Sequence, residues 1–169
     1  RIILPSQSYL VRTTHHTILV DGCVGNNKTC TFFPHWHGRD DGTFLARLAK
    51  AGVAPEQIDY VLCTHLHIDH CGWNTRLVDG RWIPTFPNAR YYMARREVER
   101  WDFRRSDYRH VPANAGIFEN SVLPILEAGL AEVVDGNRHI TPSLEIEAAP
   151  GHTAGHSVAH LTSDGKQAW

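Results

Sequence analysis

The 169-residue sequence has no excess of charge of either sign and no long apolar run. Its 17 lysines and arginines face 18 acidic residues, so a dedicated nucleic-acid binder, which usually presents a net basic surface, is not expected. No apolar run approaches the ~18 residues of a membrane span. Residues 2–4 form too short an apolar stretch for a signal peptide. We therefore predict a soluble, cytoplasmic protein that binds neither nucleic acid nor membrane.

Cysteines are few and widely spaced, at Cys23, Cys30, Cys63 and Cys71. None forms a C-x-x-C pair, and a chain of this length can bury a core large enough to fold without disulfides. We therefore predict reduced thiols. A disulfide between Cys23 and Cys30 is the alternative if the protein is exported.

The remaining composition is that of a globular domain, because 42% hydrophobic and 21% charged residues exclude a disordered or collagen-like chain. Short β-type runs alternate with helical patterns, which predicts an α/β fold in a single domain over residues 1–169. We expect helices at 43–51 (capped by Asp41), 95–103 and 117–130, and strands at 9–12, 17–20, 60–63, 81–83, 89–93, 144–148 and 160–162. Residues 163–169 predict a hairpin whose second strand has barely begun, so we expect a longer natural chain.

Twelve histidines are an excess of a residue that binds metals as a neutral imidazole. The densest group is residues 65–70 (HLHIDH), directly after the apolar run 60–63. Residues two apart on an extended segment point the same way, so His65 and His67 can bind one metal ion, and Asp69 and His70 can face a second. Imidazole and carboxylate ligands suit zinc, and manganese or iron less selectively. Sites in α/β folds lie at the ends of strands, which favours a metal site over a chance cluster on a solvated loop.

Two segments resemble the signatures of the metallo-β-lactamase fold hydrolases. Residues 63–70 (CTHLHIDH) are similar to the first signature and residues 150–156 (PGHTAGH) to the second, in the same order and at a similar separation. Residues 72–74 and 84–90 further resemble the branch of the N-acyl-homoserine lactonases and the methyl-parathion-hydrolase-like esterases. The resemblance implies an αβ/βα sandwich with its site at one edge of the two sheets, incomplete here on the C-terminal side.

The resemblance also implies metal ligands and a cofactor. His65, His67 and His152 would hold a first zinc ion, and Asp69 and His70 would contribute to a second. Two Zn²⁺ per full-length chain are expected, with Mn²⁺ or Fe²⁺ as alternatives. The family's bridging aspartate and last histidine lie downstream of the second signature, beyond the last residue of this sequence. Binuclear catalysis by this chain alone is therefore an open question.

We expect further residues to support the metal ligands or to contact the substrate. Asp21 sits where the family usually has an aspartate, and we expect it to support the ligands. His156, four residues after His152, is expected to support a ligand rather than to bind metal. Asp69 is expected to steer the proton of the leaving group besides binding metal. Three aromatic side chains are candidates for the wall of a substrate pocket: Phe33, Trp36 and Trp73.

The implied reaction is metal-assisted hydrolysis of a small ester, lactone or organophosphate-like substrate by a metal-bound hydroxide. A glyoxalase II-like thioester hydrolase is one alternative, and a nuclease is another. A non-catalytic member of the fold that binds one metal for structure is a third. We expect a small-molecule substrate as the partner, and the sequence leaves a homodimer open.

Several other patterns have plainer interpretations. His35 and His37 repeat the H-x-H spacing without a following Asp-His pair, so we interpret them as part of a solvated or pocket-rim loop. Cys71 could be a soft ligand, but a small buried residue beside the site is the simpler interpretation. Residues 95–109 hold six arginines among four acidic residues, which favours a solvated helix with internal ion pairs over a nucleic-acid surface.

Overall fold

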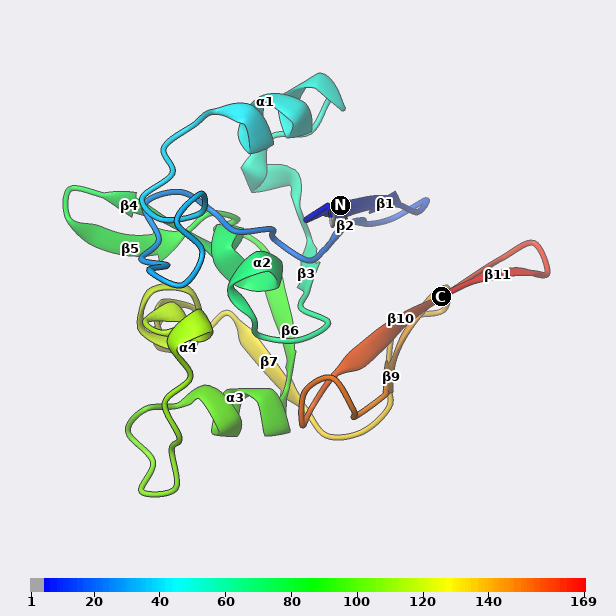
Figure 1. Ribbon diagram of the computed structural model, residues 1–169. Helices are drawn as coiled ribbons and strands as arrows, with labels where there is room; N and C mark the ends of the chain where they lie inside the picture. Colours follow the sequence, from blue (N-terminus) through cyan, green and yellow to red (C-terminus); the bar gives the residue numbers. More distant parts are fainter. Residues whose placement is uncertain (1–4) are drawn as a thin grey trace.

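The computed structural model describes residues 5–169, and its centre is a five-stranded sheet in the order β1-β2-β3-β6-β7 (Figure 1). The strands are β1 (Tyr9–Arg12), β2 (Thr17–Val20), β3 (Tyr60–Leu62), β6 (Arg90–Ala94) and β7 (Ala131–Val134). The first pair is antiparallel, as predicted, and the other neighbours are parallel. The carboxyl ends of β2, β3, β6 and β7 therefore meet at one edge of the sheet.

A second, antiparallel sheet has the order β11-β10-β9-β8. Its strands are β8 (Arg138–Thr141), β9 (Leu144–Ala148), β10 (Ser157–Ser163) and β11 (Lys166–Ala168). The predicted terminal hairpin is confirmed: Asp164 and Gly165 both have positive φ, 49° and 72°, as a two-residue I′ turn requires. The strand β4 (Thr75–Val78), which the sequence analysis did not predict, pairs with β5 (Arg81–Pro84) across a similar turn at Asp79-Gly80.

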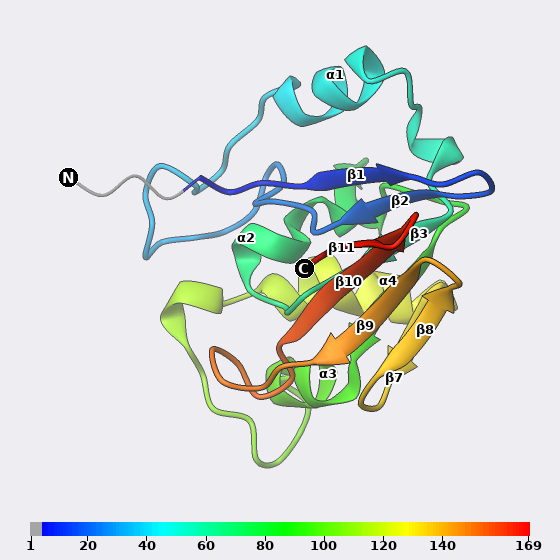
Figure 2. The ribbon, with the colours of Figure 1, turned by 90° about the vertical axis from the view of Figure 1, so that its right-hand side faces the viewer.

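The two faces of the central sheet are covered differently. Figure 1 shows the helices on one side and β9–β11 on the other, and Figure 2 shows the second sheet from its outer face. The side chains alternate accordingly along β2, since Ile18 and Val20 pack against Leu144 and Ile146 of the second sheet, whereas Leu19 packs into the core on the helix side. One helix layer and both sheets of the predicted αβ/βα sandwich are thus present, whereas in the described part of the chain no helix covers the outer face of the second sheet, in line with the expected incompleteness on the C-terminal side.

Helices α1 (Thr43–Lys50), α3 (Arg95–Trp101) and α4 (Leu123–Glu127) are shorter than the periodicity predicted, and the short helix α2 (Ile68–Cys71) was not predicted. Helix α1 begins after Gly42, and the side chain of Asp41 accepts a hydrogen bond from the amide of Thr43 at 3.0 Å. Within residues 5–169, no helix combines the length and apolarity needed to cross a bilayer.

The prediction of one helix over 117–130 is wrong. A π-helix, Phe118–Val122, precedes α4. Pro124 has no N–H to donate to the carbonyl of Asn120, so the α-helical ladder is interrupted there. That carbonyl instead accepts hydrogen bonds from the hydroxyl of Thr75 and from the ammonium of the buried Lys28 at 3.3 Å.

Helix α3 ends two residues before its predicted end. Asp102 leaves the helical conformation, and its carboxylate pairs with Arg104 at 2.7 Å. Asp107 pairs with Arg105, and Arg95 reaches Asp135 on another segment, both at 2.9 Å. Residues 95–109 therefore hold two internal ion pairs among the described residues, but both lie in the loop after the helix, and the pair of Arg95 leads outside the segment.

All four cysteines are free thiols, so the Cys23–Cys30 disulfide is not formed. Cys71 is fully buried, and its thiol donates to the backbone oxygen of His67 at 3.3 Å. This placement supports the interpretation of Cys71 as a small buried residue beside the site.

Candidate metal centre

The histidine segment begins where strand β3 leaves the central sheet. β3 lies between β2 and β6 and is buried, and Thr64 and His65 follow its carboxyl end. Asp21 follows the carboxyl end of the neighbouring parallel strand β2. Parallel neighbours end at the same edge, so the fold brings Asp21 to the histidine segment although 43 residues separate it from Thr64.

His65, His67 and His152 converge in space. One ligand atom from each lies within 4.8 Å of the others, and Nε2 of His65 is 3.2 Å from Nδ1 of His67. His65 is buried, His67 is half-buried and His152 is exposed, so the cluster opens to solvent on the side of His152. Within residues 5–169 this is the one cluster of three or more ligand-type side chains.

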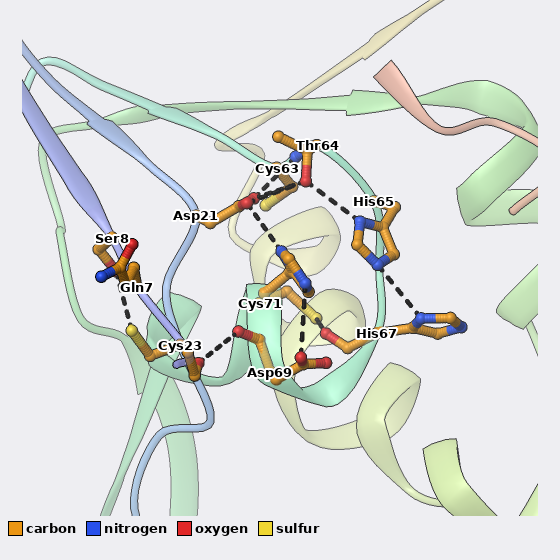
Figure 3. A network of polar contacts seen from close by, with 12 residues as sticks. Gln7, Ser8, Asp21, Cys23, Cys63, Thr64, His65, His67, Asp69 and Cys71 are labelled. Atoms are coloured by element: carbon orange, nitrogen blue, oxygen red, sulfur yellow. Dashed lines mark hydrogen bonds and ion pairs between the residues drawn. The ribbon is translucent and has the colours of Figure 1, made fainter. Parts of the chain in front are cut away.

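Asp21 organises two of the histidines at once. Its carboxylate accepts hydrogen bonds from the amide of Thr64 at 2.8 Å and from the Thr64 hydroxyl at 2.9 Å (Figure 3). Because that hydroxyl donates to Asp21, its oxygen accepts from Nδ1 of His65 at 3.1 Å. The proton of His65 is thereby held on Nδ1, and Nε2 is left as a lone pair that faces His67.

Asp21 contacts His70 directly, whereas it reaches His65 through Thr64. Nδ1 of His70 donates to Oδ2 of Asp21 at 2.8 Å, and its Nε2 lies 3.5 Å from Oδ2 of Asp69. Burial alone would lower the pKa of His70, but hydrogen bonds to the two carboxylates outweigh it and raise the pKa to about 9. Burial likewise opposes ionisation of Asp69, yet the contact with His70 lowers the net pKa of that carboxyl. Asp69 and His70 thus form an ion pair beside the three-histidine cluster.

The cluster favours neutral imidazoles. His65 is only 2% exposed, and burial together with the neighbouring histidines lowers its pKa to about 2. Burial and the proximity of His152 also lower the pKa of His67. A neutral imidazole with a free nitrogen is the form that binds a metal. Three imidazoles with converging nitrogens match the donor set of a catalytic zinc site that keeps one position open.

His156 lies beside the cluster rather than in it. Its ring centroid is 5.0 Å from that of His65 and 5.9 Å from that of His152. The structure therefore places His156 within supporting distance, and its role stays a prediction.

The aromatic residues expected at a substrate pocket lie in two places. Phe33 and Trp36 contact each other, with ring centroids 4.6 Å apart, and pack against the main core. Trp73 stacks on Phe44 of α1 at 5.0 Å and borders a cavity of about 570 Å³ between α1, β1 and the loop after β2. None of the three clustered histidines lines that cavity. In the loop after β2, His35 and His37 are both exposed, in line with the interpretation of a solvated loop, and His37 accepts a hydrogen bond from the amide of Cys30 at 3.1 Å.

The sequence analysis missed Glu97. We grouped it with the charged residues of a solvated helix, but it is fully buried on α3 and accepts hydrogen bonds from Leu66, Trp101 and Gly155. The sequence feature that could have indicated burial of Glu97 is its spacing of four residues from Trp101, which places both side chains on one face of the helix. Its contacts are developed below.

Two stacked sheets with one helix layer, and a histidine cluster at the sheet edge, form part of the arrangement that the two signatures implied. The sequence model of the family described as "Metallo-beta-lactamase superfamily" matches residues 1–165. The chain therefore belongs to the metallo-β-lactamase superfamily.

Its relatives include lactonases. An N-acyl homoserine lactonase from a Bacillus species is 23% identical over 168 residues, which cover 90% of this chain and 56% of the relative. The chain thus spans little more than half the length of the curated relatives that it matches. A probable metal-dependent hydrolase from Staphylococcus aureus has a similar structure, with a TM-score of 0.72 and 21% identity over 97% of this chain and 56% of its own. AidC, a dizinc quorum-quenching lactonase in complex with a product, gives a TM-score of 0.67 and 24% identity over 94% and 52% of the two chains.

Proposed function

We propose that the protein is a metal-dependent hydrolase of a small ester, lactone or organophosphate-like substrate, with zinc bound by His65, His67 and His152. The observation that carries the proposal is the convergence of three imidazoles from the two signature segments within 4.8 Å. Their chemistry fits zinc, because the most buried of them is held neutral with a free nitrogen directed into the cluster.

Bound zinc would supply a hydroxide at neutral pH, because it lowers the pKa of its water from 15.7 to about 7. The chain's own residues shape the rest of the site. Trp101 lies against His67, with ring centroids 5.3 Å apart, and excludes water from that side. The exposed His152 marks the side on which a substrate can enter. Asp69, with its carboxylate held ionised beside His70, can accept a proton there.

The names of the relatives support a lactone as the first substrate to test. Several are N-acyl homoserine lactonases, and a lactone is a cyclic ester with the carbonyl that metal-assisted hydrolysis requires. The pair formed by Asp69 and His70 is proposed to contribute to a second zinc site in the full-length protein, as expected from the resemblance. Mn²⁺ or Fe²⁺ remain alternatives to zinc.

The first experiment is elemental analysis together with the intact mass of the same purified protein. We expect at least one zinc per chain, and loss of zinc in a His67→Ala variant. His139→Ala is the matched control, because His139 is exposed and lies outside the cluster. Unchanged zinc content in His67→Ala would refute the ligand set.

Activity is then measured on an N-acyl homoserine lactone, an aryl ester, an organophosphate triester and a glutathione thioester, with and without a chelator. Chelator-sensitive hydrolysis of one of the first three supports the proposal. A preference for the thioester would instead indicate the glyoxalase II-like alternative. Zinc binding without hydrolysis of any substrate would indicate a non-catalytic member of the fold.

A further inference from the structure

Glu97 is a buried carboxylate that none of the proposed chemistry uses. It is fully buried, and within residues 5–169 it forms no ion pair with a lysine, arginine or histidine. Burying a carboxylate without a cation is unfavourable unless several donors satisfy it. Three N–H groups do so here: the amide of Leu66 at 3.0 Å, the indole of Trp101 at 3.0 Å and the amide of Gly155 at 2.8 Å.

Each donor belongs to the surroundings of the histidine cluster. Leu66 lies between His65 and His67 in the sequence, and Gly155 lies three residues after His152. The third donor, Trp101, packs its ring against His67. Glu97 therefore connects, through one side chain, the two segments that carry the three clustered imidazoles.

The two carboxylate oxygens of Glu97 accept different hydrogen bonds. Oε2 accepts from both Leu66 and Trp101, whereas Oε1 accepts from Gly155 alone. The loop at Leu66 has an independent support, because the side chain of Asn114 donates to the oxygen of Leu66 at 2.9 Å and accepts from the amide of Ile68 at 2.8 Å. The end of the His152 segment is tied separately, because the amide of Ser157 donates to the oxygen of Thr64 at 2.8 Å. The contribution that Glu97 makes on its own is thus the placement of the loop at Gly155, three residues after His152.

That segment also approaches the start of α3 closely. A Cβ atom at Gly155 would lie 2.8 Å from the backbone nitrogen of Glu97 and 3.0 Å from its Cγ, which is closer than carbon atoms pack without a shift. Only glycine lets this loop lie flat against the helix while its amide reaches the carboxylate. The glycine and the glutamate are therefore two parts of one contact.

We propose that Glu97 is a positioning residue that fixes His152 relative to His65 and His67, and thereby sets the metal affinity of the cluster. The inference rests on the metal site proposed above. It predicts that changes at Glu97 act on metal binding through His152 and not only through the stability of the fold.

The test is a double-mutant cycle on the full chain, with the zinc dissociation constant measured by competition with a chromophoric chelator. Glu97→Gln conserves volume, and its amide oxygen can still accept from Leu66 and Trp101. Its NH₂ group then faces the amide of Gly155, so that contact is lost. We expect zinc binding to weaken about 10–100-fold, as loss of a supporting contact to a metal ligand typically does. Glu99→Gln is the control, because it removes the same negative charge at an exposed position of the same helix. It should leave the zinc dissociation constant unchanged.

The coupling with His152 distinguishes positioning from a purely structural role. His152→Ala should cost at least threefold less in zinc affinity in the Glu97→Gln background than in the parent, because the histidine is already displaced there. Equal costs in both backgrounds, or a Glu97→Gln variant that is less stable but binds zinc normally, would overturn the proposal. A parent protein that binds no zinc would overturn the metal site itself, so the two failures are distinguishable.

A second variant covers the case in which Glu97→Gln does not fold. Gly155→Ala removes neither a metal ligand nor the carboxylate of Glu97, but the new Cβ pushes the loop away from α3. We expect weaker zinc binding here as well, whereas Gly151→Ala, where a Cβ meets nothing within 4 Å, is the matched control. Gly155→Ala with unchanged zinc affinity would overturn the proposal.

Discussion

Replacing Asp21 by asparagine tests whether this carboxylate holds His70 in its charged form. The variant keeps the shape of the side chain and an oxygen that can accept from Thr64, but it removes the negative charge 2.8 Å from Nδ1 of His70. The metal-free protein is the proper sample, because a bound metal would compete for the same imidazole.

The size of the effect follows from the pKa of His70, which is raised from 6.5 to about 9. At about 1.36 kcal/mol per pH unit, this difference corresponds to at most about 3.4 kcal/mol of folding free energy. The side chain is 30% exposed, and Asp69 also contributes from 3.5 Å. We therefore expect Asp21→Asn to remove about 2 kcal/mol of this stabilisation.

The sign determines the pH at which the loss is seen. A histidine whose pKa is higher in the folded protein stabilises it fully below pH 6.5, and this contribution disappears as the pH rises through 9. The destabilisation caused by Asp21→Asn should therefore be about 2 kcal/mol larger at pH 6 than at pH 10. Comparing variant with parent at each pH cancels the titration of other groups.

The assay is urea unfolding of the metal-free proteins at both pH values, with the pKa of His70 followed by NMR. Asp164→Asn is the control, since it makes the same change on an exposed turn where asparagine also tolerates positive φ. A pH-independent destabilisation, or a His70 pKa that stays near 9 in Asp21→Asn, would refute the reasoning.

Two further predictions concern buried positions outside the three-histidine cluster. Lys28 is fully buried, and desolvation outweighs the attraction of Cys71 and lowers its pKa from 10.5 to about 7. This corresponds to a cost of at most about 5 kcal/mol below pH 7 that vanishes above pH 10.5. Lys28→Met should therefore raise the free energy of unfolding by about 2 kcal/mol at pH 6, after loss of its hydrogen bonds to Thr75 and to the carbonyl of Asn120, and by less at pH 10.5. Destabilisation at pH 6 would contradict this. Gly72→Ala would place a Cβ in steric overlap with the backbone oxygen of Val24, so we expect a loss of about 4 kcal/mol or failure to fold, whereas Gly80→Ala should cost about 1 kcal/mol through its positive φ alone. Similar denaturation midpoints for the two glycine variants would show that the backbone yields at residue 72.

The sequence alone determined the local features. Alternating and apolar runs predicted the strands of the central sheet, and the Asp-Gly pair at 164–165 predicted the terminal hairpin, because backbone preference and side-chain period act within a few residues. The same logic placed His65 and His67 side by side, and their nitrogens lie 3.2 Å apart. The two signature segments also indicated the family, which the match over residues 1–165 shows.

Local patterns failed where a distant group decided the structure. The helical spacing over 117–130 does not show that the carbonyl freed by Pro124 finds Lys28 and Thr75, which makes the interruption tolerable. The charge of Glu97 predicted an exposed helix face, because nothing within α3 reveals that Leu66 and Gly155 supply donors from 31 and 58 residues away.

The site divides in the same way. Sequence order supplied the histidines and the two-residue spacing of His65 and His67, whose nitrogens lie 3.2 Å apart. Tertiary structure decided which proton His65 keeps, through the chain from Asp21 to Thr64, and where His152 lies. The physical reason is that a residue's type fixes what it can bind, whereas burial, tautomer and the distance between ligands depend on groups that only the folded chain brings together.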